Sequence, residues 1–366
     1  MRLSRRAFSR LAGAASLSSL ASPAWRTADA QAGGKPIGWC IVGLGTISMD
    51  HHMPAVKLGH SGRVVALVSG HRDKAEKQAA IYGVPSSAIY SYENYDAIAE
   101  NKDIDAVYIA LPNSMHAEYT IRAAKAGKHV LCEKPMATSV EDAKAMIEAC
   151  EAAGKKLMIA YRCQYEPVNL DAVAMIRSGA LGTVQAIESC NGFNIRPGQW
   201  RLNRKLAGGG PLMDVGIYSL NACRYLTGEE PHDISAYSST NDHDGRFNEV
   251  EENVSWTMKF PSGVVAACNT SYGANMDGWY RVHGSKGMLE LRPAFGYSGI
   301  HMTAEIGRQT IDEAVTPPDP QQFVVQADYF AGCIAQNREP KSDGEEGLRD
   351  MELMSRIYQS AGLPVL

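Results

Sequence analysis

Two stretches of the sequence combine residue types that can move a proton while an alcohol and a carbonyl interconvert. One is Glu133-Lys134-Pro135, and the other is residues 208–218, which read Gly-Gly-Gly-Pro-Leu-Met-Asp-Val-Gly-Ile-Tyr. In the second stretch a flexible glycine turn leads into a predicted helix, where Asp214 and Tyr218 share one face because they are four residues apart. A lysine ammonium stabilises a developing alkoxide, and it can lower the pKa of a neighbouring phenol towards the working pH. From the residues alone, a surface lysine and a buried structural Asp/Tyr pair remain open as alternatives.

A glycine-containing turn indicates where a dinucleotide could bind. Residues 43–48 read Gly-Leu-Gly-Thr-Ile-Ser, follow the apolar run at 37–42 and open a predicted helix. Gly43 permits a tight turn, and Gly45 lets backbone amides approach a pyrophosphate at the helix N-terminus, so Thr46 and Ile47 join the predicted cofactor contacts. Ser48 stands at the third position, where a small residue still permits close helix packing. A purely structural turn is the alternative.

The end of the second predicted strand indicates which dinucleotide is preferred. An enzyme that uses NAD usually places Asp or Glu there to bind the ribose 2′-hydroxyl, whereas residues 69–74 read Ser-Gly-His-Arg-Asp-Lys. Ser69 can donate to a 2′-phosphate, Arg72 can pair with it or stack on adenine, and Lys74 adds positive charge. This pattern predicts NADP(H). A solvated helix start is the alternative.

The elements that must position these residues alternate in the first half of the chain. Helix-like segments such as 117–126 separate the strands, and Thr138 and Glu141 have the spacing of a capping box for a helix that extends to Ala153. Strands alternating with helices predict a parallel sheet, that is, a Rossmann domain over residues 35–158. The buried strands are predicted at 37–42, 64–68, 106–110, 129–132 and 156–160.

The second half follows a different pattern. Several of its strands alternate between polar and apolar residues, as expected for a sheet with one open face. The last helix has Asp343 and Glu346 at its start, Leu348, Met351, Met354, Ile357 and Ala361 along one face, and Gly362 at its end. We predict an α+β domain over residues 159–366 with a large, mostly antiparallel, open-faced sheet. Its strands are expected at 183–189, 233–239, 250–260, 264–272, 280–283 and 288–291.

The N-terminus has the features of an export signal. Ser4-Arg5-Arg6-Ala7-Phe8 is followed by an apolar stretch at 11–21 and by Ala28-Asp29-Ala30, a small-x-small cleavage pattern. These features predict a twin-arginine signal over residues 1–32 and a periplasmic location. The apolar stretch is too short to span a membrane. An ordinary helix with two chance arginines is the alternative.

Composition narrows the classes of partner. A chain of 366 residues with 45% hydrophobic residues favours two globular domains. The net charge of −4 and the scattered lysines and arginines provide no basic field for nucleic acid or an anionic membrane, which leaves a small molecule as the expected partner. The eight cysteines contain no Cys-x-x-Cys pair and no closely spaced His/Cys set, so we predict no metal site.

Taken together, these residues resemble the Gfo/Idh/MocA oxidoreductases, and within that family the glucose–fructose oxidoreductases and periplasmic aldose oxidoreductases. The resemblance extends from about Gly38 to the end of the chain. Many relatives in the wider superfamily have histidine where Tyr218 stands, so the tyrosine is a mark of the sugar–sugar branch. The similar stretches are residues 66–70, 111–114, 129–139, 161–163, 199–202, 208–218 and 345–347.

The resemblance implies a site and a cofactor. Lys134, Asp214 and Tyr218 would form the catalytic group, with Tyr218 as the general acid and base for the C1 hydroxyl of a sugar. NADP(H) would be tightly bound, which suits export of a folded protein already loaded with its cofactor. The implied cofactor contacts are Ser69, Lys74, Tyr92, Leu111, Asn113, His116, Glu133, Lys134, Arg162, Trp200, Arg201 and Tyr297.

The resemblance also implies a reaction in two halves. One aldose would lose a hydride from C1 and leave as a lactone, and a second sugar would then be reduced to an alditol. Monosaccharides, with oligosaccharides as a further class, are the expected substrates. Glucose–fructose oxidoreductase has a long arm before its first strand, whereas only residues 31–36 remain here, so we expect a homodimer through the open sheet face.

Two other functions are compatible with parts of this pattern. An NAD-dependent glycosidase of the same superfamily would be expected to use histidine chemistry and an NAD-type strand end, and neither is present. A non-catalytic sugar-binding protein would retain Gly43 and Gly45 but would not need Lys134 and Tyr218 together.

Overall fold

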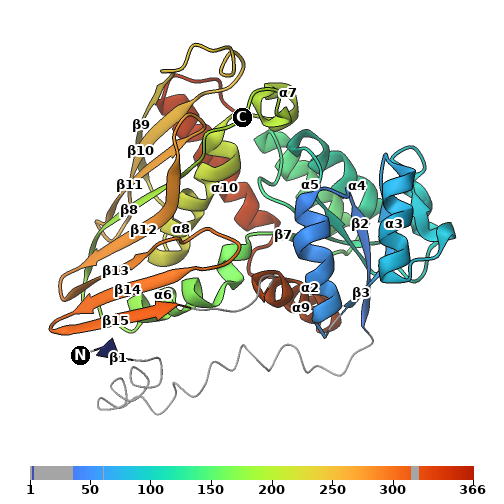
Figure 1. Cartoon of the computed structure of the whole chain (residues 1–366), viewed down its shortest axis with the longest axis horizontal. Coiled ribbons are helices and arrows are strands. Elements are labelled where there is room, and N and C mark those ends of the chain that lie inside the picture. Colours follow the sequence, from blue (N-terminus) through green and yellow to red (C-terminus); the bar gives the residue numbers. More distant parts are fainter. Residues whose placement is uncertain (1, 4–35, 61, 315–320) are drawn as a thin grey trace.

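Two β-sheets organise the chain, one parallel and one mainly antiparallel (Figure 1). The structure, a computed structural model, describes residues 2–3, 36–60, 62–314 and 321–366. The predicted export signal at 1–32 lies outside the described residues apart from Arg2–Leu3, which forms strand β1. The two sheets correspond to the predicted Rossmann domain and the predicted α+β domain, so the predicted fold class is confirmed.

The six-stranded sheet of the described chain is parallel at every pairing, in the order β4-β3-β2-β5-β6-β7. Its strands are apolar runs buried in the core, as expected where helices cover both faces of a sheet. The five predicted strands are confirmed to within two residues, and the short edge strand β4 was not predicted. The bounds are β2 (Ile37–Val42), β3 (Gly62–Val68), β4 (Ile89–Tyr90), β5 (Ala106–Ile109), β6 (His129–Cys132) and β7 (Leu157–Ile159).

Helices connect these strands. The capping box predicted at Thr138 is wrong by one residue: extended Ser139 is the N-cap, and its hydroxyl accepts the Asp142 N–H at 3.1 Å. The helical segments are η3 (Ile47–His52, a π-helix), α2 (Met53–Leu58), α3 (Arg72–Tyr82), η4 (Ser86–Ala88), η5 (Tyr95–Glu100), η6 (Asn113–Met115), α4 (His116–Lys125) and α5 (Val140–Ala152).

The second sheet has nine strands in the described chain, in the order β1-β15-β14-β13-β12-β8-β11-β10-β9. Neighbours are antiparallel except β8 with β11 and β1 with β15. Strands β14 and β15 were not predicted. The bounds are β8 (Val184–Gly192), β9 (Asp233–Ser239), β10 (Asn253–Lys259), β11 (Val265–Ser271), β12 (Met276–Gly284), β13 (Gly287–Leu291), β14 (His301–Ile306) and β15 (Gln309–Ala314).

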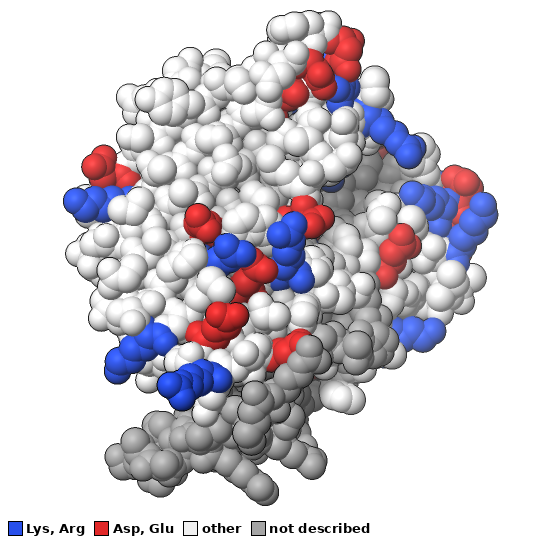
Figure 2. All heavy atoms as spheres, turned by 60° about the vertical axis from the view of Figure 1, so that its left-hand side comes forward, with Lys and Arg blue, Asp and Glu red and all other residues white. Residues whose placement is uncertain are grey.

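The two faces of this sheet differ in exposure. On β10, Val254, Trp256 and Met258 are buried, whereas the alternate residues Ser255 and Thr257 are exposed. Helix α8 (Ile217–Thr227) packs against β8 and β11 on the buried side. Figure 2 brings the sheet side of the molecule forward and shows a mostly uncharged surface with interspersed acidic and basic groups.

The C-terminal helices return to the parallel sheet. Helix α9 (Gln321–Ala335) packs against α2, with the Phe330 ring 6.0 Å from that of Trp39, and α10 (Gly344–Ser360) packs against α5. The predicted cap of α10 is confirmed, because Asp343 accepts the Glu346 N–H at 2.9 Å. No helix in the described ranges is long and apolar enough to cross a membrane. The remaining segments are η7 (Arg162–Tyr165), α6 (Pro167–Arg177), η8 (Trp200–Leu202), α7 (Arg204–Ala207) and η9 (Leu212–Gly216).

Candidate active site

One cavity of about 850 Å³ lies between the carboxyl ends of the parallel strands and the second sheet. This is where open α/β sheets bind their ligands, and its volume suits a dinucleotide with a small partner. The structure brings all the predicted site residues except Arg72 to its wall. They are Gly43, Gly45, Thr46, Ile47, Ser69, Lys74, Tyr92, Leu111, Asn113, His116, Glu133, Lys134, Arg162, Trp200, Arg201, Asp214, Tyr218 and Tyr297.

The glycine turn forms one end of this cavity. Gly43 has a φ of +91°, which favours glycine, and its N–H donates to the Val68 carbonyl at 3.0 Å. A Cβ placed on Gly45 would meet nothing within 4 Å, so the backbone there is open to a ligand. Ser48 donates its hydroxyl to the Gly43 carbonyl at 2.6 Å, which explains a serine at the third position of the motif. The turn therefore fits a dinucleotide pyrophosphate, although the segment that follows it begins as a π-helix.

At the end of β3, two of the three residues predicted to contact a 2′-phosphate lie on the cavity wall and one does not. Ser69 and Lys74 line the cavity, and so does His71, which the sequence analysis did not select. Arg72 does not line it: its guanidinium donates to Glu76 at 2.9 Å and to the Ile89 carbonyl at 3.1 Å. Arg72 ties α3 to the edge of the sheet, so a phosphate contact is left to the other residues at this end.

Lys134 and Asp214 are held together at the opposite end. The Lys134 ammonium donates to the Asp214 backbone carbonyl at 2.6 Å and lies 3.5 Å from its Oδ1. Asp214 Oδ2 is 2.9 Å from Arg201 Nε and accepts the Tyr272 hydroxyl at 2.8 Å. Burial raises the pKa of Asp214, but the charges of Lys134 and Arg201 outweigh burial and lower the pKa overall. Asp214 is therefore an anion that orients the lysine, and it is a poor proton acceptor.

Tyr218 lies between two cations. The Lys134 ammonium is 4.6 Å and the Arg162 guanidinium 4.8 Å from the centroid of its ring, and Phe295 stacks on it at 5.6 Å. The expected lowering of the Tyr218 pKa is wrong: burial raises it, and the nearby charge of Arg162 offsets burial only in part. The resting side chain is a neutral phenol.

The helix that carries Asp214 and Tyr218 also differs from the prediction. Asp214 lies in the π-helical segment η9, and the α-helical segment α8 begins only at Ile217. The two side chains therefore do not keep regular α-helical spacing. Both nevertheless line the cavity.

Arg162 fixes the wall that faces Tyr218. Its guanidinium donates to the carbonyls of Phe295 at 2.6 Å and Gly296 at 2.9 Å, and to Gln322 Oε1 at 2.8 Å. Tyr297, in the same loop, has its ring 4.5 Å from the Arg162 guanidinium and 4.2 Å from the His51 ring. The loop is thus held from both domains.

Two further predicted residues in the cavity wall are held by hydrogen bonds to neighbouring segments. Glu133 accepts the Tyr108 hydroxyl at 2.7 Å, and burial raises its pKa. His116 has its ring nitrogens 2.8 Å from the Pro135 carbonyl and 3.0 Å from the Leu111 carbonyl, and burial lowers its pKa to about 4. His116 is therefore neutral at physiological pH and links the loops after β5 and β6.

Several lining residues were missed by the sequence analysis. Seven of them adjoin predicted residues in the sequence and could have been included on that ground. Asn191, Phe193 and Phe295 do not adjoin a predicted residue, and only the fold brings them to the cavity. The missed residues are Leu44, His71, Ala110, Pro112, Asn191, Phe193, Gln199, Val215, Phe295 and Gly296.

The thiols and acidic groups have no metal-binding arrangement in the described ranges. None of the eight cysteines, all at described positions, forms a disulfide, and seven of them are buried. Among the residues with a described position, no group of three or more His, Cys, Asp or Glu side chains could hold a metal ion.

Two family models match the chain. Residues 37–161 match "Oxidoreductase family, NAD-binding Rossmann fold", and residues 170–290 match "GFO/IDH/MocA C-terminal domain". Together the matches include the glycine turn, Lys134, Asp214 and Tyr218.

Three known proteins similar to this chain have names that describe action on sugars. The crystal structure of aldose-aldose oxidoreductase from Caulobacter crescentus is 46% identical, with a TM-score of 0.87, and the similarity covers 90% of this chain and 98% of that one. D-xylose 1-dehydrogenase [NADP(+)] of Haloarcula marismortui is 32% identical over 89% of this chain and 91% of its own length. D-xylose 1-dehydrogenase (NADP(+)) 2 of Haloferax volcanii is 31% identical over 88% of this chain and 96% of its own length.

Proposed function

Since the chain belongs to the Gfo/Idh/MocA family and is an NAD(P)-dependent sugar oxidoreductase, we propose that it retains NADP(H) and transfers hydride between two sugars. In the first half-reaction an aldose is oxidised at C1 to its lactone. In the second, another sugar enters the same site and is reduced to an alditol. Monosaccharides are the expected substrates, and oligosaccharides are a further class.

The observation that carries this proposal is the continuity of one cavity. It joins the glycine turn, which fits a pyrophosphate, to Lys134 and Tyr218, which fit a sugar hydroxyl. Aldose-aldose oxidoreductase and the xylose dehydrogenases are the relatives whose names describe such substrates. A binding protein would not need a lysine and a tyrosine side by side at this point.

The side chains of the site have distinct tasks in this scheme. A bound nicotinamide supplies the hydride acceptor and donor. Tyr218 exchanges a proton with the C1 oxygen, and the positive charges of Lys134 and Arg162 stabilise the negative charge that develops there. Asp214 orients the lysine through its carbonyl and its carboxylate.

The preference for NADP(H) rests on the end of β3. Ser69 stands where an NAD enzyme usually has a carboxylate, and Lys74 adds positive charge to the same end of the cavity. Two relatives carry NADP(+) in their names. Tight retention would prevent loss of the cofactor outside the cytoplasm.

Location and assembly belong to the same proposal. Residues 1–32 would direct the folded, cofactor-loaded chain through the twin-arginine route to the periplasm. The exposed face of the nine-stranded sheet would form a homodimer, because its surface is mostly uncharged (Figure 2).

The test is the absorbance spectrum of the purified protein before and after glucose is added, with no cofactor supplied. We expect the reduced-nicotinamide band to rise with glucose and to fall when a second sugar is added as acceptor. A protein that contains nucleotide but shows neither change with a panel of aldoses would contradict the proposal. A change seen only with glycosides would favour a glycosidase.

A further inference from the structure

A small second cavity lies behind the catalytic residues. It measures about 10 Å³, which is about the space that one water molecule needs. Lys134 and Tyr218 line both this inner cavity and the large one, so these two side chains form the wall between them. The remaining lining residues of the inner cavity are Tyr161, Cys163, Ile217, Asn221 and Tyr225.

The proposed chemistry needs a proton acceptor beyond Tyr218. Its phenol is neutral at rest because burial raises its pKa, so Tyr218 accepts a proton from a sugar only if it gives one away. Asp214 is a poor acceptor, because neighbouring cations lower its pKa. Glu133 is the nearest rival acceptor, since burial raises its pKa and it also lines the large cavity.

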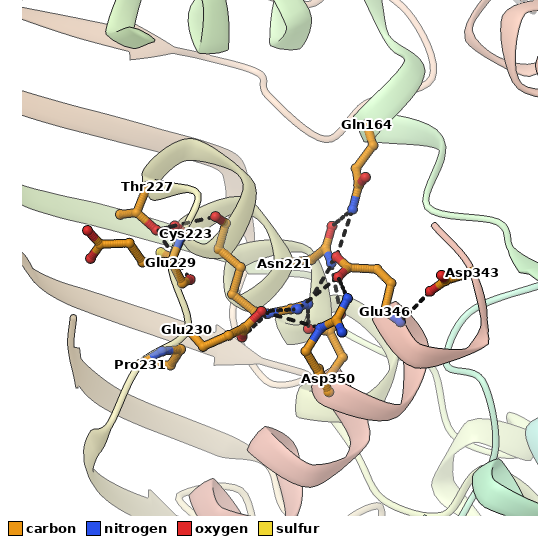
Figure 3. Close-up of polar contacts among 12 residues, drawn as sticks. Gln164, Asn221, Cys223, Thr227, Glu229, Glu230, Pro231, Asp343, Glu346 and Asp350 are labelled. Carbon is orange, nitrogen blue, oxygen red and sulfur yellow. Dashed lines mark hydrogen bonds and ion pairs between the residues drawn. The ribbon is translucent and has the colours of Figure 1, made fainter. Parts of the chain in front are cut away.

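The far side of the inner cavity leads to a buried carboxylate. Tyr161 is 5% exposed, and its buried hydroxyl lies beside Asp350, where its interaction with the carboxyl partly offsets the rise in the Asp350 pKa. Asn221 donates from its amide to Asp350 at 3.0 Å and to Glu346 at 3.2 Å, as Figure 3 shows.

This carboxylate is held in a charged network that reaches the surface. Asp350 is fully buried and accepts from Arg224 at 2.6 Å. The same guanidinium pairs with Glu346 at 2.8 Å and with Glu230 at 2.6 Å, and Glu230 is half exposed. Tyr218, Asn221 and Arg224 are three residues apart in sequence on α8, so one face of this helix runs from the active site to the network.

We propose that Asp350 is the proton store of the sugar oxidoreductase, reached from Tyr218 through one water molecule in the inner cavity and the Tyr161 hydroxyl. The inference rests on the proposed function. In the oxidative half-reaction the C1–H bond supplies a hydride to bound NADP⁺, and the O–H proton passes along this route to the Asp350 carboxylate. In the reductive half-reaction the hydride and the proton return to the second sugar, so neither has to be exchanged with solvent.

The electrostatics of Asp350 suit this task. Besides the Asn221 amide, three charged or titratable groups of the described chain face it: Arg224 from α8, Glu346 one turn earlier on α10, and Tyr161 from the segment after β7. Burial raises the pKa of Asp350 to about 6, although Arg224 opposes the rise. A carboxyl group with this pKa can take up a proton and return it near neutral pH.

Tyr161→Phe is the sharpest test, because it removes only the hydroxyl that joins the inner cavity to Asp350. We expect the thermal stability and the cofactor content to be unchanged. Single-turnover reduction of the bound cofactor by glucose should be slowed about tenfold. This loss is smaller than the usual loss when a proton-transfer group is removed, because water can fill the space left by the hydroxyl. The solvent deuterium isotope effect should rise. The matched control is Tyr165→Phe, which removes a buried hydroxyl that bonds Ser342 away from the inner cavity, and which should leave the isotope effect unchanged. A wild-type rate and isotope effect in Tyr161→Phe would overturn the route.

Asp350→Asn tests the store itself, with a readout that does not depend on turnover. Infrared spectra of the resting protein should contain a protonated-carboxyl band that is lost as the pH rises through about 6, and Asp350→Asn should lack it. The wild-type oxidative rate should fall below this pH, because a protonated Asp350 accepts no further proton. In Asp350→Asn the oxidative rate should no longer fall at low pH, and turnover should be roughly 10²-fold slower than in wild type. If the decline in rate at low pH and the wild-type rate both persist in Asp350→Asn, Asp350 is not the proton acceptor and the proposal fails.

The failure of the route and the failure of the proposed function give different results. If no aldose reduces the wild-type cofactor, the proposed function is wrong, whereas the infrared band still reports whether Asp350 titrates. If wild type is active and both variants match it, only the proton route is wrong.

Discussion

The ammonium of Lys134 lies 4.6 Å from the centroid of the Tyr218 ring, over the ring face. A cation over an aromatic face is attracted to the ring, and the attraction strengthens if the phenol loses its proton. Lys134 is also bound to the Asp214 carbonyl, so its position is fixed before substrate enters. The pair is therefore arranged to stabilise charge as it develops, even though the resting Tyr218 is neutral.

Replacing Tyr218 with phenylalanine should slow the transfer of hydride from glucose to the bound cofactor by about 10²–10⁴-fold, because the phenol handles the proton. The cofactor should stay bound, since most of its predicted contacts lie in the Rossmann domain. The measurement is single-turnover reduction followed by absorbance, with bound nucleotide determined after acid extraction. A rate close to wild type would make Tyr218 a packing residue.

Lys134→Ala should also abolish turnover, and unlike the change at Tyr218 it should loosen the nicotinamide end of the cofactor. The ammonium lines the cavity and is expected to touch both cofactor and sugar, and its loss removes the positive charge next to Asp214. Nucleotide retained after extensive dialysis is the readout. Retention equal to that of wild type would limit the role of Lys134 to the sugar.

The protein should contain NADP(H), and Ser69→Asp should weaken NADP binding and favour NAD by charge repulsion and a new ribose contact. Lys74→Ala should weaken NADP retention, whereas Arg72→Ala should leave it unchanged, because Arg72 is engaged with Glu76 outside the cavity. Chromatography of the acid extract identifies the nucleotide. An extract that contains only NAD would refute the assignment.

Val265→Arg should convert the proposed dimer into a monomer. Val265 is 43% exposed on β11, within the outward face of the nine-stranded sheet, and a charge there opposes burial in an interface. Leu58→Arg is the control, because Leu58 is 61% exposed on α2, in the Rossmann domain. Light scattering at micromolar concentration reports the mass, and a monomeric wild-type protein would rule out the dimer.

Arg224→Met should lower the free energy of unfolding by about 3–5 kcal/mol, because it leaves the buried carboxylates of Asp350 and Glu346 without their cation. Arg72→Ala, which removes an exposed ion pair with Glu76 and a hydrogen bond to the Ile89 carbonyl, should cost about 1–2 kcal/mol. Urea unfolding at neutral pH compares the two. Equal losses would mean that the buried network adds little to stability.

The parallel sheet could be predicted because its strands are continuous apolar runs with glycines and helices between them. The second sheet was harder, since β15 contains Gln, Thr, Asp and Glu and lacks a clear alternation of apolar residues, whereas β14 alternates polar and apolar residues and could have been predicted on that ground. The capping serine of α5 was missed because Thr138 and Ser139 adjoin, and only the backbone conformation decides between them.

The site itself could be predicted largely from spacing and family resemblance, but its electrostatics could not. The pKa of Tyr218 depends on burial and on Arg162, which is distant in sequence. Arg72 has a sequence context that suits a phosphate contact, yet its direction is set by Glu76 and the Ile89 carbonyl. Such effects depend on tertiary neighbours that a local pattern does not contain.

The return of α9 and α10 to the parallel sheet constrains how the protein can be made. Phe330 packs near Trp39, and the Ile159 N–H donates to the Ser342 carbonyl at 2.7 Å, so the first domain is completed by the last part of the chain. The ribosome must therefore make the chain through α9 and the segment that holds Ser342 before the cofactor-binding core can close. Truncation before α9 should leave that core exposed, and the nascent chain should capture its nucleotide only after these segments have emerged.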